Sequence, residues 1–422
     1  MSELHPWPAP SAPGRLAATV TLPGSKSLTN RALVLAALSE SPTRLTAPLR
    51  ARDTLLMADA LRALGVDVVD EGAGWLVRPG PLHGAEVACG LAGTVMRFVP
   101  ALAALADGDS RFDGDPVART RPMATLLGAL RAAGAVIDGN FLPFSVYGRG
   151  ALAGGRIELD ASASSQFVSA LLLAATRFDA GADIVHTGAS LPSLPHIAMT
   201  IAGVREAGGE IAAVSDRHWR VAPGKLDLPD QVIEPDLSNA APFLAAALVT
   251  GGQVTVPHWP AATTQPGAQL AELFTRLGAS VTLGPDGLTV TGTGQIAALD
   301  VDLHEASELT PVIAALCALA DGPSRIRGVA HIRGHETDRL AALRAELSGI
   351  GCTVSETPDG LAIEPAALRA ATWHAYADHR MAQAGAVLGL AVPGIEIDDI
   401  GCTSKTLADF PDLWAQLLEQ SA

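Results

Sequence analysis

A pattern that recurs about every 70 residues is the feature of this 422-residue sequence that most limits its fold. Six times, a short cluster of polar or charged residues precedes an apolar run rich in Ala, Leu and Val. The clusters are centred on Ser27, Thr94, Ser165, Ser238, Glu308 and His379. Self-similarity at a fixed period indicates copies of one supersecondary unit that stack to bury a continuous core. We therefore predict six repeats of one α/β unit.

A second landmark keeps the same period and gives the order of elements within a repeat. Five amphipathic segments end in a glycine and lead into a β-branched run: these are Gly65, Gly134, Gly208, Gly278 and Gly351. Glycine just after a helix is the usual helix terminator, and β-branched residues favour strands. We predict that each repeat runs strand, helix, strand, helix, strand, strand.

The first polar cluster, Pro23-Gly24-Ser25-Lys26-Ser27-Leu28-Thr29-Asn30-Arg31, predicts an anion site. Gly24 and Ser25 are turn and N-cap residues, so Lys26 is expected in the first turn of a helix. Unpaired backbone N–H groups and the helix dipole attract anions there. A capped surface helix explains any one such cluster equally well, but six copies favour a shared anionic ligand.

Composition narrows the class of protein. The net charge of −15 disfavours a nucleic-acid partner, because binding to phosphate backbones needs a basic face. The apolar runs are too short to span a membrane, and the N-terminal Pro-rich stretch lacks the pattern of a signal peptide, so we expect a cytoplasmic protein with a short tail. The four cysteines have no partner at metal-ligand or disulfide-framework spacing, which predicts no metal site.

At 422 residues, the chain is long enough for two or three domains. The polar, proline-containing stretch 227–231 separates the third repeat from the fourth. The strand expected at residues 17–22 precedes the first repeat, so the N-terminal segment is assigned to the second half. We predict a discontinuous domain of residues 1–21 plus 231–422 and a second domain of residues 22–230, each with three repeats.

Seven short motifs, in order, resemble the 5-enolpyruvylshikimate-3-phosphate (EPSP) synthase family, also called 3-phosphoshikimate 1-carboxyvinyltransferase. They are PGSKSLTNR, AGTVMRF, RTRPM, SSQF, HETDRL, DHRMA and GCTSKT. The resemblance covers residues 21–413. It implies the two-domain enolpyruvyl transferase fold, with three βαβαββ units per domain around a pseudo-threefold axis.

The resemblance also implies a reaction in the shikimate pathway of aromatic amino acid biosynthesis. The enolpyruvyl group of phosphoenolpyruvate moves to the 5-hydroxyl of shikimate 3-phosphate, with release of phosphate through a tetrahedral intermediate. No metal, nucleotide or redox cofactor is implied, the partners are the two small-molecule substrates, and glyphosate is expected as an inhibitor. We expect a monomer.

Residues are carried over only where the motifs match. The shikimate-3-phosphate contacts implied are Lys26, Ser27, Arg31, Ser164, Ser165, Gln166, Ser193, Glu308 and His335. The phosphoenolpyruvate contacts implied are Lys26, Gly93, Thr94, Arg121, Gln166, Arg339, Arg380 and Lys405. The proton-transfer roles fall to Glu308, Glu336, Lys26 and His335, whose individual shares spacing cannot separate.

The chain departs from the family pattern at several of these positions. Glu308 stands for the usual aspartate, and His335 stands where many members carry lysine. Leu91 replaces an asparagine, so its polar contact is missing or made by backbone. His196 replaces a tyrosine, and His331 replaces an asparagine that contacts shikimate 3-phosphate. His379 matches a cleft residue, for which a helix-capping role is the alternative.

Two alternatives stay open from the sequence. The sister enolpyruvyl transferase acting on UDP-N-acetylglucosamine shares fold and donor, but it carries GAKN at the first motif and a reactive cysteine where this chain has residues 114–121 without one. A non-catalytic anion-binding relative would keep the repeats and lose the acid/base residues. A P-loop kinase is excluded, because Lys26 follows Ser25 and not the glycine that the motif requires.

Overall fold

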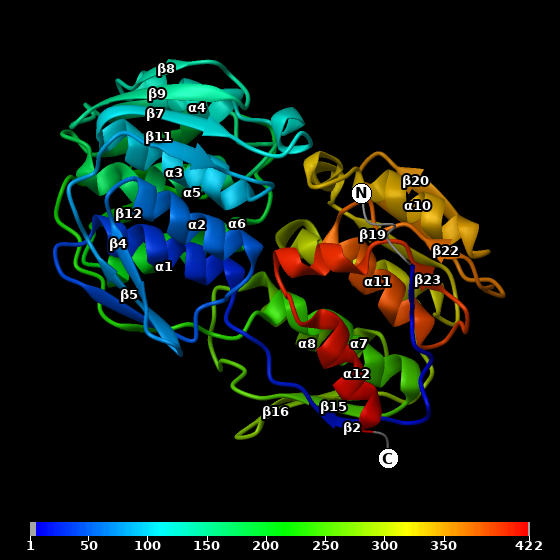
Figure 1. Cartoon of the computed structure of the whole chain (residues 1–422). Coiled ribbons are helices and arrows are strands. Elements are labelled where there is room, and N and C mark those ends of the chain that lie inside the picture. The colour runs from blue at the N-terminus through cyan, green and yellow to red at the C-terminus, as the bar shows by residue number, and fades with distance from the viewer. Residues whose placement is uncertain (1–5, 421–422) are drawn as a thin grey trace. The chain divides into compact units, whose positions relative to one another are not determined.

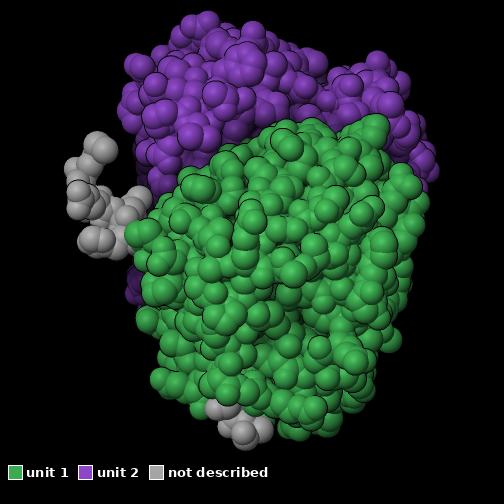
Figure 2. All heavy atoms as spheres, turned by 90° about the vertical axis from the view of Figure 1, so that its right-hand side faces the viewer, with its two compact units in different colours: residues 1–23, 234–422 green, residues 24–233 purple. Residues whose placement is uncertain are grey.

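The structure is a computed structural model that describes residues 6–420. Its chain divides into two compact units, shown in separate colours in Figure 2. Unit 1 comprises Met1–Pro23 and Glu234–Ala422, and unit 2 comprises Gly24–Ile233. Each unit has its own hydrophobic core. That each folds as an independent domain stays a prediction, which is taken up in the Discussion.

Three helices of unit 2 are buried along almost their whole length. They are α1 (Lys26–Leu38), α3 (Gly93–Leu105) and α5 (Gln166–Ala174), and each packs against the other two. The polar clusters at their starts are followed by runs that are apolar on every side, which is the pattern of a fully enclosed helix. These inner helices form the centre of the unit (Figure 1).

The second helix of each repeat in unit 2 is amphipathic and covers the inner trio. These outer helices are α2 (Arg52–Ala63), α4 (Ala124–Ala132) and α6 (Leu194–Glu206). Each packs against two inner helices: α2 on α1 and α3, α4 on α3 and α5, and α6 on α5 and α1. The three repeats are therefore arranged in turn around the inner trio.

Three four-stranded sheets complete unit 2, and all three have the same topology. In strand order they are β14 (Gln231–Val232), β3 (Thr43–Thr46), β5 (Gly74–Arg78), β4 (Asp67–Asp70); β6 (Glu86–Ala88), β7 (Asp107–Asp113), β9 (Phe144–Arg149), β8 (Val136–Asp138); and β10 (Gly155–Leu159), β11 (Ala182–His186), β13 (His218–Val221), β12 (Ile211–Ser215). The first two strands of each sheet are parallel and the other pairings are antiparallel. This confirms the predicted element order of the repeats.

Unit 1 repeats this plan. Its inner helices are α7 (Leu237–Thr250), α9 (Thr310–Ala318) and α11 (His379–Gly389), which pack against one another. Its other helices are α8 (Leu270–Arg276), α10 (Arg339–Gly349) and α12 (Phe410–Glu419). Two sheets have four strands: β2 (Ala17–Thr19), β15 (Gln253–Val256), β17 (Gly287–Thr291), β16 (Ser280–Gly284); and β18 (Asp300–Asp302), β19 (Ser324–Arg327), β21 (Gly360–Glu364), β20 (Thr353–Thr357).

The leading strands of the first and fourth repeats come from distant parts of the chain. Strand β2, next to the N-terminus, pairs in parallel with β15 of the fourth repeat. Strand β14, at the end of unit 2, pairs in parallel with β3 of the first repeat. The chain therefore passes between the units twice, once in each direction.

The N-terminal segment corrects one expectation, because residues 6–15 are not simply a Pro-rich tail. Strand β1 (Trp7–Pro8) pairs antiparallel with β23 (Glu396–Ile397), which is parallel to β22 (Thr372–Trp373). Ala9 is buried there as well. The sixth repeat ends without a final strand pair of its own, and β1 supplies the antiparallel strand. Residues 1–5 of the expected tail lie outside the described part of the chain.

The helix-ending glycines confirm the second landmark. Gly65, Gly134, Gly208, Gly278 and Gly351 all have φ between 84° and 111°. Residues with a Cβ rarely adopt this conformation, so glycine at these positions turns the chain from the outer helix towards the next strand.

Candidate active site

The first turn of α1 carries Lys26, the first residue of the helix, and it is capped as predicted. The Ser25 side chain accepts a hydrogen bond from the backbone N–H of Leu28 (3.5 Å). Lys26 Nζ lies 3.6 Å from Oδ2 of Asp53, a carboxylate in the first turn of α2 that is only 2% exposed. The ammonium group is therefore held at the helix N-terminus by a buried carboxylate of the neighbouring helix.

Arg31, one turn further along α1, is buried and joins α1 to α6. Its guanidinium donates to Thr200 Oγ1 (2.7 Å), to the carbonyl of Ser27 (3.0 Å) and to the carbonyl of His196 (3.1 Å). Burial lowers the pKa of Arg31 to about 9, so the side chain still carries its charge at neutral pH. Ser193 lies at the start of the same helix α6, in the left-handed conformation (φ 54°).

The first turn of α3 places two arginines around Gly93. A Cβ on Gly93 would lie 3.1 Å from Nη1 of Arg121 and 3.3 Å from Nη1 of Arg97. Asn30 of α1 donates to Thr94 Oγ1 (2.7 Å), which ties the starts of α1 and α3 together. Arg121 Nη1 donates to the carbonyl of Leu91 (3.3 Å). At this position, where leucine replaces the asparagine of the family pattern, the backbone therefore makes a polar contact.

Arg97 lies beside Gly93 and was assigned no role from the sequence. Its Nη1 donates to Oε1 of Gln166 (2.7 Å), the first residue of α5, and its guanidinium lies over the Phe167 ring. The Gln166 backbone N–H in turn donates to Ser164 Oγ (3.3 Å). The signal that could have identified Arg97 is its place in the AGTVMRF motif, one helical turn after Gly93.

The predicted residues of unit 2 form a set at or near the starts of helices that pack against one another. We call this the unit 2 cluster, and it consists of Lys26, Ser27, Arg31, Gly93, Thr94, Arg121, Ser164, Ser165, Gln166 and Ser193. All lie at or next to the N-terminal ends of α1, α3, α5 and α6, except Arg121, which lies beside Gly93. Fixed cations and helix N-termini together favour a multiply charged anion.

In unit 1, Arg339 is the centre of a buried ionic network. It is the first residue of α10, and its guanidinium makes two hydrogen bonds to Asp378, from Nε (2.7 Å) and from Nη2 (3.1 Å). Nη2 also donates to Glu336 (3.1 Å), whose other oxygen pairs with Lys405. All four side chains are less than 10% exposed.

Arg380 extends this network to Glu308. Its Nη1 donates to the carbonyl of Ser238 (2.8 Å), and the hydroxyl of Ser238 donates to Glu308 Oε1 (3.4 Å). Ser238 is in the first turn of α7, Glu308 lies two residues before the start of α9, and Arg380 is in the first turn of α11. The starts of all three inner helices of unit 1 thus contribute to one group, as in unit 2.

Arg339 and Arg380 differ in the direction in which their surroundings shift the pKa. Burial opposes the charge of Arg339, but the carboxylates of Asp378 and Glu336 hold its pKa above the usual value. Burial lowers the pKa of Arg380, against the opposing effect of Asp236 and Glu308. An anionic ligand would complete the charge balance of Arg380 more than that of Arg339.

Histidines occupy the side of the network next to Glu308. Nδ1 of His335 lies 3.2 Å from Arg339 Nη1, and because a guanidinium only donates, this ring nitrogen accepts. His335 is therefore neutral in this arrangement, with its proton on Nε2. His331 contacts the hydroxyl of Ser307 through Nε2 (2.8 Å), and its ring lies 5.9 Å from that of His335.

These residues form the unit 1 cluster: Glu308, His335, Glu336, Arg339, Arg380 and Lys405. Asp378 belongs to it as well, although the sequence analysis gave it no role. Asp378 caps α11 by accepting from the backbone N–H of Arg380 (2.9 Å), so its place at the start of the DHRMA motif was the available signal. His379, the first residue of α11, is 2% exposed, and its Nδ1 is 3.7 Å from Asp378.

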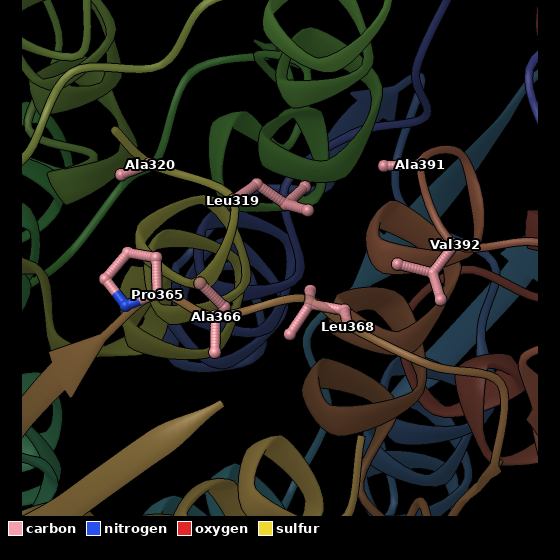
Figure 3. A pocket seen from close by; sticks show the side chains of 8 residues that line it. Leu319, Ala320, Pro365, Ala366, Leu368, Ala391 and Val392 are labelled. Carbon is pink, nitrogen blue, oxygen red and sulfur yellow. The ribbon is translucent and has the colours of Figure 1, made fainter. Parts of the chain in front are cut away.

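The hollow drawn in Figure 3 lies away from the unit 1 cluster. It has a volume of about 270 Å³, and Figure 3 shows it surrounded by small and apolar side chains, among them Leu319, Leu368 and Val392. These residues follow the C-terminal ends of α9, β21 and α11, whereas the cluster lies at the N-terminal ends of the inner helices. The hollow contributes no charged side chain and is not part of the candidate site.

Two further features of residues 6–420 bear on the kind of site. No three or more His, Cys, Asp and Glu side chains within this range are grouped so that they could hold a metal ion. Within the same range, no helix has both the length and the apolar character needed to cross a membrane.

Residues 10–414 match the family described as EPSP synthase (3-phosphoshikimate 1-carboxyvinyltransferase). The chain belongs to the EPSP synthase family. Its curated relatives include a 3-phosphoshikimate 1-carboxyvinyltransferase of Kocuria rhizophila, which is 53% identical over 433 residues, or 98% of this chain and 96% of the relative. This EPSP synthase family member is accordingly a transferase, and these findings do not support the UDP-N-acetylglucosamine enzyme.

Solved structures agree on the fold of this EPSP synthase family member. An EPSP synthase from Acinetobacter baumannii matches with a TM-score of 0.80 and 23% identity, covering 98% of each chain. The enolpyruvyl transferase NikO from Streptomyces tendae matches with a TM-score of 0.78 and 18% identity, covering 98% of this chain and 97% of its own. The predicted enolpyruvyl transferase fold is therefore confirmed.

Proposed function

We propose that the chain transfers the enolpyruvyl group of phosphoenolpyruvate to the 5-hydroxyl of shikimate 3-phosphate and releases phosphate. The observation that carries this proposal is the network of Lys405, Glu336, Arg339, Asp378 and Arg380 at the helix starts of unit 1. It concentrates three cations in an acidic protein of net charge −15. Such an arrangement suits a small ligand that carries both carboxylate and phosphate groups.

We assign the acceptor substrate chiefly to the unit 2 cluster. Lys26, Ser27, Arg31, Ser164, Ser165, Gln166 and Ser193 are proposed to contact shikimate 3-phosphate. Arg31 is anchored by four hydrogen bonds, to Thr200, Ser27, Ser169 and His196, so its planar guanidinium is fixed before any ligand binds. A fixed guanidinium fork loses little entropy when it binds a carboxylate.

We propose the phosphoenolpyruvate contacts from the residues that the family motifs imply. Arg121, Arg339, Arg380, Lys405 and Lys26 are proposed to hold its carboxylate and phosphate. Gly93 and Thr94 are proposed to present backbone to it, because a glycine at a helix start lets a ligand approach closely. Gln166, held by Arg97, is proposed to contact both substrates.

The reaction needs one proton delivered and one removed in each half. We propose that Glu308 accepts the proton of the 5-hydroxyl while the hydroxyl oxygen attacks C2 of phosphoenolpyruvate. At the same time, an acid protonates the methylene carbon of phosphoenolpyruvate. A tetrahedral intermediate results. Loss of phosphate and of a proton from the new methyl group then restores the double bond. Glu336, Lys26 and His335 are the remaining acid/base candidates.

The proton-transfer candidates lie in suitable surroundings. The carboxylate of Glu308 accepts from the Ser238 hydroxyl (3.4 Å), and the Ser238 carbonyl accepts from Arg380, so a cation lies near the proposed base. Neutral His335 presents Nε2–H as a donor, in contrast to the lysine found in many relatives. No electrons are gained or lost in the overall transfer, so the proposal requires no redox cofactor.

Further parts of the proposal concern the molecule in its setting. We propose that the chain works as a monomer in the cytoplasm and that glyphosate inhibits it in competition with phosphoenolpyruvate. The chain's own residues supply every substrate contact assigned above, so no second copy is needed. Size-exclusion chromatography with light scattering, and inhibition kinetics at several phosphoenolpyruvate concentrations, test these two points.

The central experiment measures phosphate release from phosphoenolpyruvate with shikimate 3-phosphate as acceptor. Wild-type protein should release phosphate and form EPSP, and Glu308→Gln should lower kcat by about 10²–10⁴-fold, the usual contribution of a general base. UDP-N-acetylglucosamine is the control acceptor and should be inert. A silent wild-type protein would favour a non-catalytic relative, and turnover only with the control acceptor would favour the sister enzyme.

A further inference from the structure

Two consecutive residues other than glycine adopt the left-handed conformation directly before Asp378 of the unit 1 cluster. They are Tyr376 (φ 55°) and Ala377 (φ 53°). They are the central residues of a turn that is closed by a hydrogen bond from the Asp378 N–H to the carbonyl of Ala375 (2.9 Å). Turns with positive φ at both central residues strongly favour Gly, Asn and Asp. This turn is therefore strained, and its surroundings must hold it.

Glu346 holds the turn from the side of α10. The Tyr376 hydroxyl donates to Oε1 of Glu346 (2.6 Å), and the His374 backbone N–H donates to Oε2 (2.9 Å). The His374 ring nitrogen Nδ1 lies 3.2 Å from the same oxygen. Glu346 itself is only 7% exposed, whereas His374 and Tyr376 are each about half exposed. A single buried carboxylate thus anchors both sides of the turn.

The same helix holds the end of the turn through Arg339. Arg339 and Glu346 are seven residues apart, which places them on one face of α10 two turns apart. Arg339 binds Asp378, the residue that closes the turn, and Asp378 caps the helix that carries Arg380. The turn therefore connects Glu346 to the placement of two of the proposed phosphoenolpyruvate cations.

We propose that Glu346 is a positioning residue for phosphoenolpyruvate: through Tyr376 and His374 it holds the strained turn that sets Asp378, and thereby Arg339 and Arg380, in place. Strain stored at a functional site persists only where neighbouring contacts enforce it. This inference rests on the proposed function, because it takes Arg339 and Arg380 to bind phosphoenolpyruvate.

The first test is Glu346→Gln, which keeps the size of the side chain. An amide oxygen can still accept from the His374 N–H, but the contact with the Tyr376 hydroxyl survives only with donor and acceptor reversed, and both bonds lose the strength that the carboxylate charge gives them. We expect the KM for phosphoenolpyruvate to rise by about tenfold or more, with a smaller fall in kcat. The dissociation constant for shikimate 3-phosphate, measured by calorimetry without phosphoenolpyruvate, should stay within about twofold of wild type.

The matched control is Glu356→Gln in the same unit. Glu356 also binds two side-chain donors, Arg333 (2.6 Å) and Arg344 (2.9 Å), and Arg344 belongs to α10. It makes no contact with the turn. Its substitution should leave both kinetic constants within about twofold of wild type. Equal losses in both variants would mean that any damage to α10 has this effect, and would overturn the proposal.

A rescue variant separates positioning from general loss of stability. In Glu346→Gln/Ala377→Gly, the glycine adopts positive φ without steric cost, so the turn should persist without its anchor. We expect the KM for phosphoenolpyruvate to recover most of the way to wild type. If Glu346→Gln only lowers the melting temperature, with unchanged KM and kcat per folded molecule, or if the rescue fails in a folded protein, the proposal is wrong.

A readout independent of activity covers the case in which the proposed function itself fails. The chain has two tyrosines, so Tyr147→Phe leaves only Tyr376 to titrate. Burial and the Glu346 carboxylate raise the pKa of Tyr376 to about 12. Ultraviolet titration should show this high value and a fall on adding Glu346→Gln. An ordinary tyrosine pKa in the Tyr147→Phe protein would refute the contact between Tyr376 and Glu346. A wild-type protein without transferase activity would refute only the proposed function.

Discussion

Gly93 is a position where a single added atom would crowd two buried cations. A Cβ at this position would lie 3.1 Å from Arg121 Nη1 and 3.3 Å from Arg97 Nη1, closer than most real Cβ contacts. Both guanidinium groups are buried and hydrogen-bonded, Arg121 to Leu91 and Arg97 to Gln166. The methyl group of an alanine would therefore displace a cation or narrow the space where phosphoenolpyruvate is proposed to bind.

Gly93→Ala should accordingly raise the KM for phosphoenolpyruvate by about three- to tenfold and weaken inhibition by the bulkier glyphosate by more than that. Steady-state kinetics with both ligands measure the two effects. Gly128→Ala, in a helix of unit 2 with open space at the Cβ, is the control. Unchanged glyphosate inhibition in Gly93→Ala would show that this residue does not face the ligand.

Arg121 is expected to matter for the reaction more than for the fold. Its guanidinium donates to the Leu91 carbonyl and lies beside Gly93. Arg121→Ala should lower kcat/KM for phosphoenolpyruvate by about 10²–10³-fold, as for other preorganised donors. The melting temperature should change little. A variant that unfolds readily but keeps wild-type turnover per folded molecule would contradict this role.

His331 should make the stability of unit 1 depend on pH. Burial, with smaller effects of His304 and Arg339 against Glu308, lowers the pKa of His331 to about 4 from an ordinary value of 6.5. The unfolded chain therefore takes up a proton at higher pH than the folded one. Stability is complete above pH 6.5 and falls as the pH drops towards 4, by up to about 3 kcal/mol.

His331→Asn should remove this part of the acid sensitivity. Urea unfolding followed by circular dichroism at pH 7 and at pH 4.5 measures the difference in the free energy of unfolding. His258→Asn is the control, since His258 is exposed and at positive φ, which asparagine tolerates. An equal pH dependence in wild type and His331→Asn would refute the assignment.

At the scale of elements, the inner helices depend on close approach by small residues. Helix α11 passes Trp373 at Gly385, where a Cβ would lie 2.7–3.0 Å from three atoms of the indole ring. The ring is fully buried and donates from Nε1 to the carbonyl of Met381 (2.8 Å), so it is held in place from the same helix. Since α11 carries Arg380 at its start, packing along the helix supports the geometry of the site.

Gly385→Ala should therefore destabilise the protein although alanine is the better helix former. Overpacking of a rigid core costs about 1–3 kcal/mol, against a gain in helix propensity of up to about 1 kcal/mol. Thermal unfolding should show a lower melting temperature. Gly128→Ala in α4, with nothing within 4 Å of the added atom, should instead be neutral or stabilising. A higher melting temperature in both variants would show that α11 moves easily away from Trp373, which would contradict this prediction.

At the scale of the whole molecule, the exchange of leading strands decides which pieces of chain belong together. Unit 2 is one continuous segment, 24–233, which contains all the strands of its three sheets. Unit 1 needs β1 and β2 from residues 7–19 to complete two of its sheets. Sheets that lack a strand expose unpaired backbone and apolar surface.

An excised fragment 24–233 should fold and unfold cooperatively by circular dichroism. A fragment 234–422 should be markedly less stable, and joining residues 6–23 to it in a circular permutant should restore its stability. If fragment 24–233 is unfolded while 234–422 alone is as stable as the permutant, the assignment of the strands to separate folding domains is wrong.

The period of the polar clusters and the helix-ending glycines determined the repeat, its element order and the helix starts at which the site residues lie. Local signals sufficed there, because capping, turn formation and hydrophobic periodicity act over a few residues. The motifs then indicated the EPSP synthase family, and with it the roles predicted for Lys26, Arg121, Arg339 and Arg380. Only the tertiary structure decided the rest. Pairing of β1 with β23 joins residues about 390 positions apart, and Arg97, Asp378 and Glu346 bind partners that meet them only when separate repeats pack together.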